Sequence, residues 1–232
     1  ANYVKENRNQ EKIGNLNWKE IINKDTDAKL PSSSFLAIIL KFLSCILFNT
    51  FFRVKVKGKE KIEMDKPTIY VANHQSFLDG FLFNYAVPSK LVKKTYFLAT
   101  VAHFKSSIMK SFANSSNVVL VDINKDIAEV MQILAKILKE NKNVAIYPEG
   151  LRTRDGKMNK FKKSFAILAK ELNVDVQPYV ISGAYELFPT GKKFPKPGKI
   201  SVEFLDKIKV EDLSYDEIVD KSYKAIEEKL TK

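Results

Sequence analysis

Cysteine and histidine are the scarcest chemistry-bearing residues in this chain of 232 residues. The single cysteine, Cys45, excludes a disulfide framework. With only His74 and His103 besides, a zinc site would depend mainly on carboxylates, so we expect neither a metal nor another cofactor. The sequence also contains no Walker loop, no G-x-G-x-x-G, no G-x-S-x-G and no internal repeat. These absences argue against the common nucleotide-binding motifs and against a serine nucleophile on a strand-to-helix elbow.

Negative charge is in short supply relative to positive charge. The net charge of +12 predicts an anionic partner, which is nucleic acid, anionic lipid or a phosphorylated substrate. Phe and Tyr are spread through core-like positions rather than interleaved with Lys and Arg on one strand face, so we expect no nucleic acid. A content of 45% apolar and 28% charged residues is typical of a globular protein. The length suits one substantial α/β domain.

The N-terminal part divides into a polar and an apolar segment. Residues 1–33 are predicted to be a leader or linker, and residues 34–52 a membrane-associating helix or helix pair. A helix from Phe35 to Phe52 would be roughly 27 Å long, barely the thickness of a hydrocarbon core. Lys41 lies near its middle, where a charge costs on the order of 3 kcal/mol in a spanning helix. We therefore favour a helix in the membrane interface, with a buried core helix and a spanning helix as open alternatives.

Residues 53–232 are predicted to form the main domain, and they begin with a basic strand. Arg53, Lys55 and Lys57 alternate with Val54 and Val56, so the charges share one face. One interpretation is an edge strand that lysines protect from pairing with another chain. The other is a cationic face for an anionic leaflet, where each charge contributes about 1 kcal/mol. Both can hold at once.

Strand and helix patterns alternate along the rest of the chain. This alternation predicts an α/β fold with a mainly parallel central sheet flanked by helices. Loops that follow strands would then lie at the carboxyl edge of the sheet, where ligands bind in open α/β folds. The predicted strands are 68–72, 95–99, 117–121, 143–147, 175–181 and 199–205, and the predicted helices are 77–87, 101–113, 125–141, 161–172 and 214–231.

The loop after the strand at 68–72 carries His74 and Asp79. A neutral imidazole can take a proton from an alcohol near pH 7. A carboxylate on its other nitrogen would hold the tautomer and stabilise the imidazolium. The chain between the two residues is long enough for Asp79 to fold back onto His74. From this stretch alone, a structural interpretation explains the pair equally well: His74 would be a capped turn residue, and Asp79 an acidic residue in the first turn of a helix.

A second polar loop follows the strand at 143–147 and contains Pro148, Glu149, Gly150, Arg152 and Thr153. The pattern Asn73-His74-x-x-x-x-Asp79, followed in order by Pro148-Glu149-Gly150-x-Arg152, resembles the glycerophospholipid acyltransferase family. These are the 1-acyl-sn-glycerol-3-phosphate and related lysophospholipid acyltransferases. The likeness covers residues from about Val56 to about Asp206 and includes Pro178 and Gly183.

The resemblance implies transfer of a fatty acyl group from acyl-CoA or acyl carrier protein to the hydroxyl of a phosphate-bearing glycerolipid. It implies that His74 is the general base, that Asp79 orients it, and that no covalent enzyme intermediate forms. Arg152 would hold the acceptor phosphate with its planar fork. It further implies a monotopic or peripheral protein at the cytoplasmic face of the cell membrane. The other substrate-binding residues would be Asn73, Glu149, Gly150 and Thr153, although simple pairing of Glu149 with Arg152 explains that glutamate nearly as well.

Three positions depart from the family pattern. The Arg that commonly follows an Asp after the next strand is absent in Asp122-Ile123-Asn124, a common Lys is replaced by Thr100, and Leu151 stands where Thr is usual. Lys105 and Lys125 are candidate substitutes for the missing charges. These losses weaken the case for glycerol 3-phosphate or lysophosphatidate as the acceptor and leave room for a lysophospholipid with a larger headgroup.

This variant of the family pattern is similar to the acyltransferase part of bacterial proteins in which the acyltransferase is fused to an acyl-activating synthetase. The resemblance therefore implies an acyl-activating synthetase domain as a further partner. A non-catalytic lipid-binding or membrane-tethering protein with the same fold is the alternative function. A tether would have no use for His74, Asp79, Glu149 and Arg152 together, so we favour the enzyme.

Overall fold

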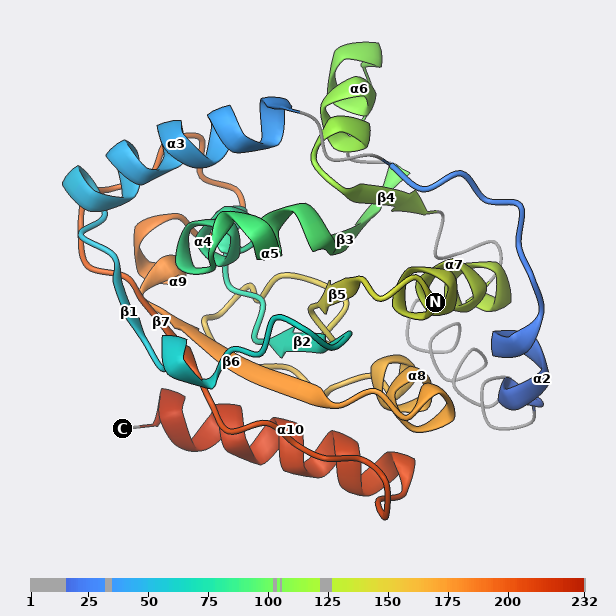
Figure 1. Ribbon diagram of the computed structural model, residues 1–232. Helices are drawn as coiled ribbons and strands as arrows, with labels where there is room; N and C mark the ends of the chain where they lie inside the picture. Colours follow the sequence, from blue (N-terminus) through green and yellow to red (C-terminus); the bar gives the residue numbers. More distant parts are fainter. Residues whose placement is uncertain (1–15, 32–34, 102–103, 105, 122–126, 232) are drawn as a thin grey trace, which may run out of the picture.

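The computed structural model describes residues 16–31, 35–101, 104, 106–121 and 127–231, and its ribbon is shown in Figure 1. The predicted strands and main helices are present over these residues, with ends that differ by a few positions. Two short helices, α5 (Ser89–Lys94) and α9 (Ala184–Leu187), were not predicted. The elements are α2 (Trp18–Asn23), α3 (Phe35–Thr50), β1 (Lys55–Lys57), η1 (Lys59–Lys61), β2 (Ile69–Ala72), α4 (Asp79–Ala86), α5 (Ser89–Lys94), β3 (Thr95–Thr100), α6 (Ser107–Ser115), β4 (Val118–Val121), α7 (Ile127–Lys139), β5 (Asn143–Ile146), α8 (Ser164–Leu172), β6 (Val176–Ser182), α9 (Ala184–Leu187), β7 (Ser201–Phe204) and α10 (Tyr215–Leu230).

The described strands form one seven-stranded sheet in the order β1-β7-β6-β2-β5-β3-β4. Neighbours are parallel except β6 and β7, which are antiparallel, so the prediction of a mainly parallel sheet is confirmed. β2 lies between β5 and β6, with Val71 opposite Ile146 on one side and opposite Pro178 on the other. The loops that leave β2 and β5 therefore start side by side at the carboxyl edge. β1 is the outermost strand on its side, as the lysine pattern predicted.

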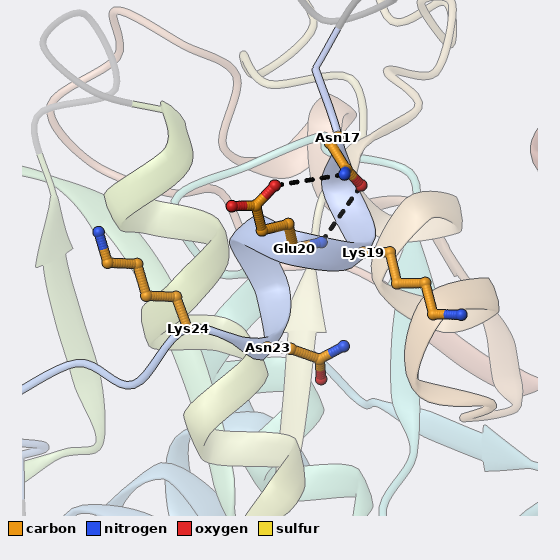
Figure 2. A pocket seen from close by; sticks show the side chains of 5 residues that line it. All are labelled: Asn17, Lys19, Glu20, Asn23 and Lys24. Carbon is orange, nitrogen blue, oxygen red and sulfur yellow. Dashed lines mark hydrogen bonds between the residues drawn. The ribbon is translucent and has the colours of Figure 1, made fainter.

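The segment expected to be a leader or linker packs on the domain over residues 16–31. α2 buries Trp18 and Ile22 against the helices α7 and α8. Lys136 Nζ donates to the carbonyl oxygens of Thr26 and Ala28, each at 3.0 Å, which holds the chain after α2. Figure 2 shows a surface hollow beside this helix, lined by Asn17, Lys19, Glu20, Asn23 and Lys24.

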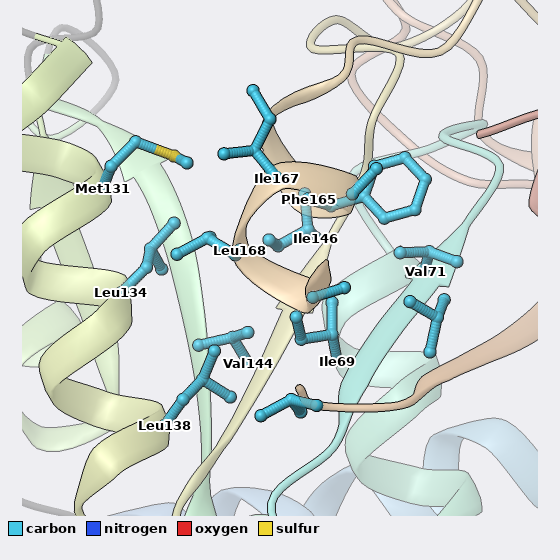
Figure 3. Close-up of a cluster of buried hydrophobic side chains, with 14 of the residues drawn as sticks. Ile69, Val71, Met131, Leu134, Leu138, Val144, Ile146, Phe165, Ile167 and Leu168 are labelled. Carbon is cyan, nitrogen blue, oxygen red and sulfur yellow. The ribbon is translucent and has the colours of Figure 1, made fainter. Parts of the chain in front are cut away.

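Helices cover both faces of the sheet, and alternate residues of β2 point to opposite faces. Ile69 and Val71 belong to a core with side chains of α2, α7, α8 and α10, part of which Figure 3 shows. Tyr70 and Ala72 belong to a second core, beneath α3, α4 and α5. This two-sided burial explains why β2 reads as a continuous apolar run, as expected for a central parallel strand.

α3 buries one side against the domain and exposes the other. Phe48 and Phe52 are buried, and the Lys41 ammonium donates to the carbonyl of Val87 at the end of α4. Burial lowers the pKa of Lys41 below its ordinary value. The lysine at the middle of the apolar segment therefore faces protein. Among the described side chains of this helix, four large apolar ones are exposed, namely Ile39, Phe42, Ile46 and Leu47, together with Asn49 and Thr50 near its end.

None of the described helices is both long enough and apolar enough to cross a membrane.

Candidate active site

His74 and Asp79 contact each other directly in the loop between β2 and α4. The His74 Nδ1 to Asp79 Oδ2 distance is 2.7 Å. The carboxylate is fully buried, whereas the imidazole side chain is 22% exposed. With Nδ1 engaged by Asp79, the ring nitrogen left to meet another molecule is Nε2. The loop therefore presents a partly exposed imidazole held by a buried carboxylate, a geometry that is compatible with proton transfer at Nε2.

One carboxylate oxygen of Asp79, Oδ2, accepts hydrogen bonds from three donors. Besides the imidazole, the backbone N–H groups of Gln75 and Ser76 donate to Oδ2 at 2.7 and 2.9 Å. Asp79 is the first residue of α4, so the loop folds back onto the start of its own helix. Within the described residues, the other oxygen, Oδ1, is buried without a hydrogen-bond partner. The three donors fix which oxygen faces His74.

Tyr147 stacks on the imidazole from the neighbouring strand. The ring centroids of His74 and Tyr147 are 4.3 Å apart and the planes differ by 13°. The Tyr179 hydroxyl donates to the Tyr147 hydroxyl at 3.2 Å, and burial raises the pKa of both phenols well above the ordinary value. Tyr147 directly precedes the Pro148-Glu149-Gly150 stretch, and no role for it was predicted from the sequence. Its place at the end of β5, beside β2, is what brings it to the imidazole.

Glu149 joins the two loops. Its Oε1 accepts from the backbone N–H of His74 at 2.6 Å, and its Oε2 accepts from the backbone and side-chain nitrogens of Asn159 at 2.7 and 2.9 Å. Burial raises the pKa of Glu149, and the hydrogen bonds oppose that rise. The pairing of Glu149 with Arg152 that we considered is not formed, because both carboxylate oxygens are engaged by His74 and Asn159.

Asn73, Gly150 and Thr153 all have their contacts inside the protein. The Asn73 amide exchanges hydrogen bonds with the backbone N–H and C=O of Ile181 at 2.9 and 2.8 Å, which extends the pairing of β2 with β6 by one residue. Thr153 is buried and its N–H donates to the His74 carbonyl at 2.8 Å. Gly150 has φ +77°, a left-handed backbone conformation that strains residues with a Cβ, so glycine suits this position. These residues shape the two loops.

Arg152 differs from its neighbours because its head group points to an aromatic surface. The guanidinium carbon lies 6.0 Å from the centroid of the exposed Phe77 ring. Over the part of the chain that the structure describes, Arg152 makes no ion pair. The residue that follows Arg152, Thr153, donates its N–H to the His74 carbonyl, so Arg152 is next in the chain to a residue in contact with the His74 loop. Lys105 and Lys125, which we suggested as further phosphate contacts, lie outside the described residues.

No described group of three or more His, Cys, Asp or Glu side chains is arranged to hold a metal ion. The hollow beside α2 contains none of the motif residues. Its Asn17 and Glu20 form the hydrogen bonds of a helix N-cap, with Asn17 Oδ1 accepting from Glu20 N at 3.3 Å. The carboxyl edge of β2 and β5 is thus the place where the sequence motifs and a partly exposed base coincide.

Comparison with known protein families shows which family the two loops belong to. The profile of the acyltransferase family matches residues 53–182, a range that includes both loops. The chain belongs to the acyltransferase family. The resemblance inferred from the two motifs is thereby confirmed.

The chain is 32% identical to a 1-acyl-sn-glycerol-3-phosphate acyltransferase of Chlamydomonas reinhardtii, over 68% of this chain and 48% of that protein. It is 28% identical to the chloroplastic 1-acyl-sn-glycerol-3-phosphate acyltransferase LPAT1 of Arabidopsis thaliana, over 67% of this chain and 43% of that one. The chain therefore spans about half the length of these relatives. Its fold matches the crystal structure of the 1-acyl-sn-glycerophosphate (LPA) acyltransferase PlsC from Thermotoga maritima with a TM-score of 0.69 and 27% identity, covering 83% and 79% of the two chains.

Proposed function

We propose that the chain is the catalytic domain of an enzyme that transfers a fatty acyl group from an acyl thioester to the free hydroxyl of lysophosphatidate. The observation that carries the proposal is the 2.7 Å contact between a partly exposed His74 and a buried Asp79 at the carboxyl edge of the sheet. The names of the relatives support lysophosphatidate as the acceptor. The sequence departures had left the acceptor open between lysophosphatidate and a lysophospholipid with a larger headgroup. Acyl-CoA and acyl carrier protein both fit as the donor.

His74 Nε2 would remove the proton from the acceptor hydroxyl as its oxygen forms a bond with the thioester carbonyl carbon. Asp79 would keep the proton on Nδ1 and stabilise the imidazolium. When the tetrahedral intermediate collapses, the carbon–sulfur bond breaks and the imidazolium returns its proton to the leaving thiolate. The acyl group passes directly to the acceptor. Ser76 is not a candidate nucleophile, because its hydroxyl donates to the carbonyl of Phe188 at 2.8 Å.

Arg152 would bind the acceptor phosphate, since a guanidinium offers two parallel N–H donors to phosphate oxygens. Its lack of an ion pair among the described residues supports this role. Asn73, Glu149, Gly150 and Thr153 would act on the substrate indirectly, by holding the backbone of the two loops. In this proposal Glu149 positions His74 through the backbone N–H of that residue.

α3 would place the domain on the membrane surface at the cytoplasmic face, as a monotopic or peripheral anchor. The apolar side chains of its outer face and the inward direction of Lys41 support this placement. A site held at the interface meets an acceptor whose acyl chain is in the bilayer. The basic face of β1 would add electrostatic attraction to anionic lipid.

The test is incubation of the purified chain with an acyl thioester and a panel of lysophospholipids, followed by lipid analysis. We expect phosphatidate from lysophosphatidate, and background levels from folded His74→Ala. Product from a larger lysophospholipid but not from lysophosphatidate would overturn the acceptor assignment. A folded, vesicle-bound wild-type chain that acylates none of the panel would favour the non-catalytic tether.

A further inference from the structure

The connection from α9 to β7 is unusually basic and exposed. Residues 189–199, which we call the basic loop, contain four lysines and no acidic residue. Phe194 at its middle is 83% exposed, the highest value of any large apolar side chain in the described chain. An exposed aromatic side chain is therefore adjacent in sequence to exposed cationic ones. The four lysines are all exposed: Lys192, Lys193, Lys196 and Lys199.

Hydrogen bonds attach the basic loop to both functional parts of the protein. Near its start, Ser76 Oγ donates to the Phe188 carbonyl at 2.8 Å and Thr190 Oγ1 donates to the Thr153 carbonyl at 3.4 Å. These two bonds connect it to the loops that carry His74 and Arg152. Near its end, Gly198 N donates to the carbonyl of Phe51 at 3.2 Å, directly after α3. Figure 1 shows this segment, in orange to red, passing behind α3 on its way to β7.

The loop is braced rather than loosely extended. Lys196 N donates to the Leu187 carbonyl at 2.8 Å, and Lys192 N donates to the Pro189 carbonyl at 3.2 Å. Proline at positions 189, 195 and 197 restricts the backbone further. At the tip, a Cβ on Gly191 would meet nothing within 4 Å. Phe194 is therefore held outward by a restrained backbone instead of folding onto the domain.

We propose that the basic loop is a second contact with the membrane, in which Phe194 enters the interface of an anionic bilayer and the lysines bind lipid phosphates. An aromatic side chain among lysines is the combination that favours an anionic lipid surface, because the ring enters the boundary region while the ammonium groups meet the phosphates. This proposal rests on the membrane placement by α3 proposed above. Attachment at two points would fix the orientation of the domain, so that the rim of the His74 site faces the bilayer.

The effect on binding follows from the number of charges removed. A lysine close to an anionic leaflet contributes about 1 kcal/mol, which is about fivefold in the partition constant. Lys192→Gln/Lys193→Gln should therefore weaken binding to anionic vesicles roughly 25-fold at low salt. Phe194→Ser should weaken binding roughly tenfold, because an aromatic side chain loses its apolar burial.

The experiment uses the full chain and its sedimentation with vesicles of phosphatidylcholine, alone or mixed with phosphatidylglycerol. The matched control is Lys221→Gln/Lys224→Gln, which removes two exposed lysines of α10 on the opposite side of the sheet. We expect the loop variants to bind anionic vesicles less well than this control. The lysine variant should lose its deficit at high salt, while Phe194→Ser keeps most of its own. Melting curves and activity on a short-chain soluble acceptor should match wild type for all variants.

A fluorescent label on the thiol introduced by Phe194→Cys, in a Cys45→Ser background, provides an independent readout. Its emission should shift to the blue on anionic vesicles and be quenched by brominated lipid. A label that stays in water, or loop variants that bind like the control, would overturn the proposal while leaving the α3 anchor and the catalytic function in place. Wild type that fails to bind either vesicle would overturn both membrane proposals, and activity on the soluble acceptor would still test the catalysis.

Discussion

Asp79→Asn is the substitution whose outcome the geometry predicts most sharply. In the wild-type protein, Asp79 Oδ2 accepts from His74 Nδ1 and from two backbone N–H groups, whereas Oδ1 has no partner among the described residues. An amide at this position must direct its oxygen to the two backbone N–H groups, because its NH₂ group would face two donors in the other orientation. The amide oxygen then also faces His74 Nδ1, and the imidazole keeps the tautomer that the reaction needs.

The expected loss of activity is consequently moderate. A hydrogen bond to a charged group is stronger than a neutral one by about 1 to 2 kcal/mol, which corresponds to about 5- to 30-fold in rate. In a serine protease, the corresponding change gives the wrong tautomer and costs about 10⁴-fold. The buried NH₂ group that replaces Oδ1 has no acceptor and should lower the stability by about 1 to 3 kcal/mol. For a domain of this size, that is a fall of about 2 to 12 °C in Tm.

The assay is kcat with acyl-CoA and lysophosphatidate, together with a thermal melt of the same preparation. Asp212→Asn, at an exposed position, is the matched control and should change neither quantity. Asp79→Ala removes the orienting group altogether and should be slower than Asp79→Asn. A loss near 10⁴-fold in folded Asp79→Asn would refute the reasoning, because it would mean that the amide nitrogen faces His74.

Three further predictions concern Tyr147, Arg152 and α3. Tyr147→Phe should keep kcat near wild type, because the ring still stacks on His74, and should lower Tm by a few degrees, because the Tyr179 hydroxyl loses its partner. Tyr147→Leu removes the stack and should reduce kcat roughly tenfold. Arg152→Lys should raise the KM of the acceptor roughly tenfold with the KM of the donor unchanged, because charge is kept and the planar fork is lost; a rise confined to the donor would contradict the assignment. Phe42→Ser/Ile46→Ser should reduce sedimentation of the protein with vesicles, while activity on a soluble short-chain acceptor stays at the wild-type level. Aggregation of this variant both with and without detergent would instead indicate that this face of α3 belongs to the core.

The alternation of strands and helices, the His74–Asp79 contact and the edge position of β1 could all be predicted from the sequence. Each depends on residues close together in the chain. Side-chain periodicity identifies a strand or a helix from a few neighbours. Asp79 reaches His74 because both belong to one strand-to-helix loop. The edge position of β1 followed from its alternating lysines, which a central strand could not bury.

Only the tertiary structure decided which distant residues support the site. β2 pairs with β5 and β6, and this order brings Tyr147 to the His74 ring and the Glu149 carboxylate to the His74 backbone. The pairing of Glu149 with Arg152 was an open alternative from the sequence, yet the carboxylate accepts from His74 and Asn159. The packing of Trp18 on the core was likewise invisible in a polar segment. Local sequence patterns do not show which strands become neighbours in the sheet. The strand order depends on how the helical crossovers between distant segments pack to bury both faces of the sheet.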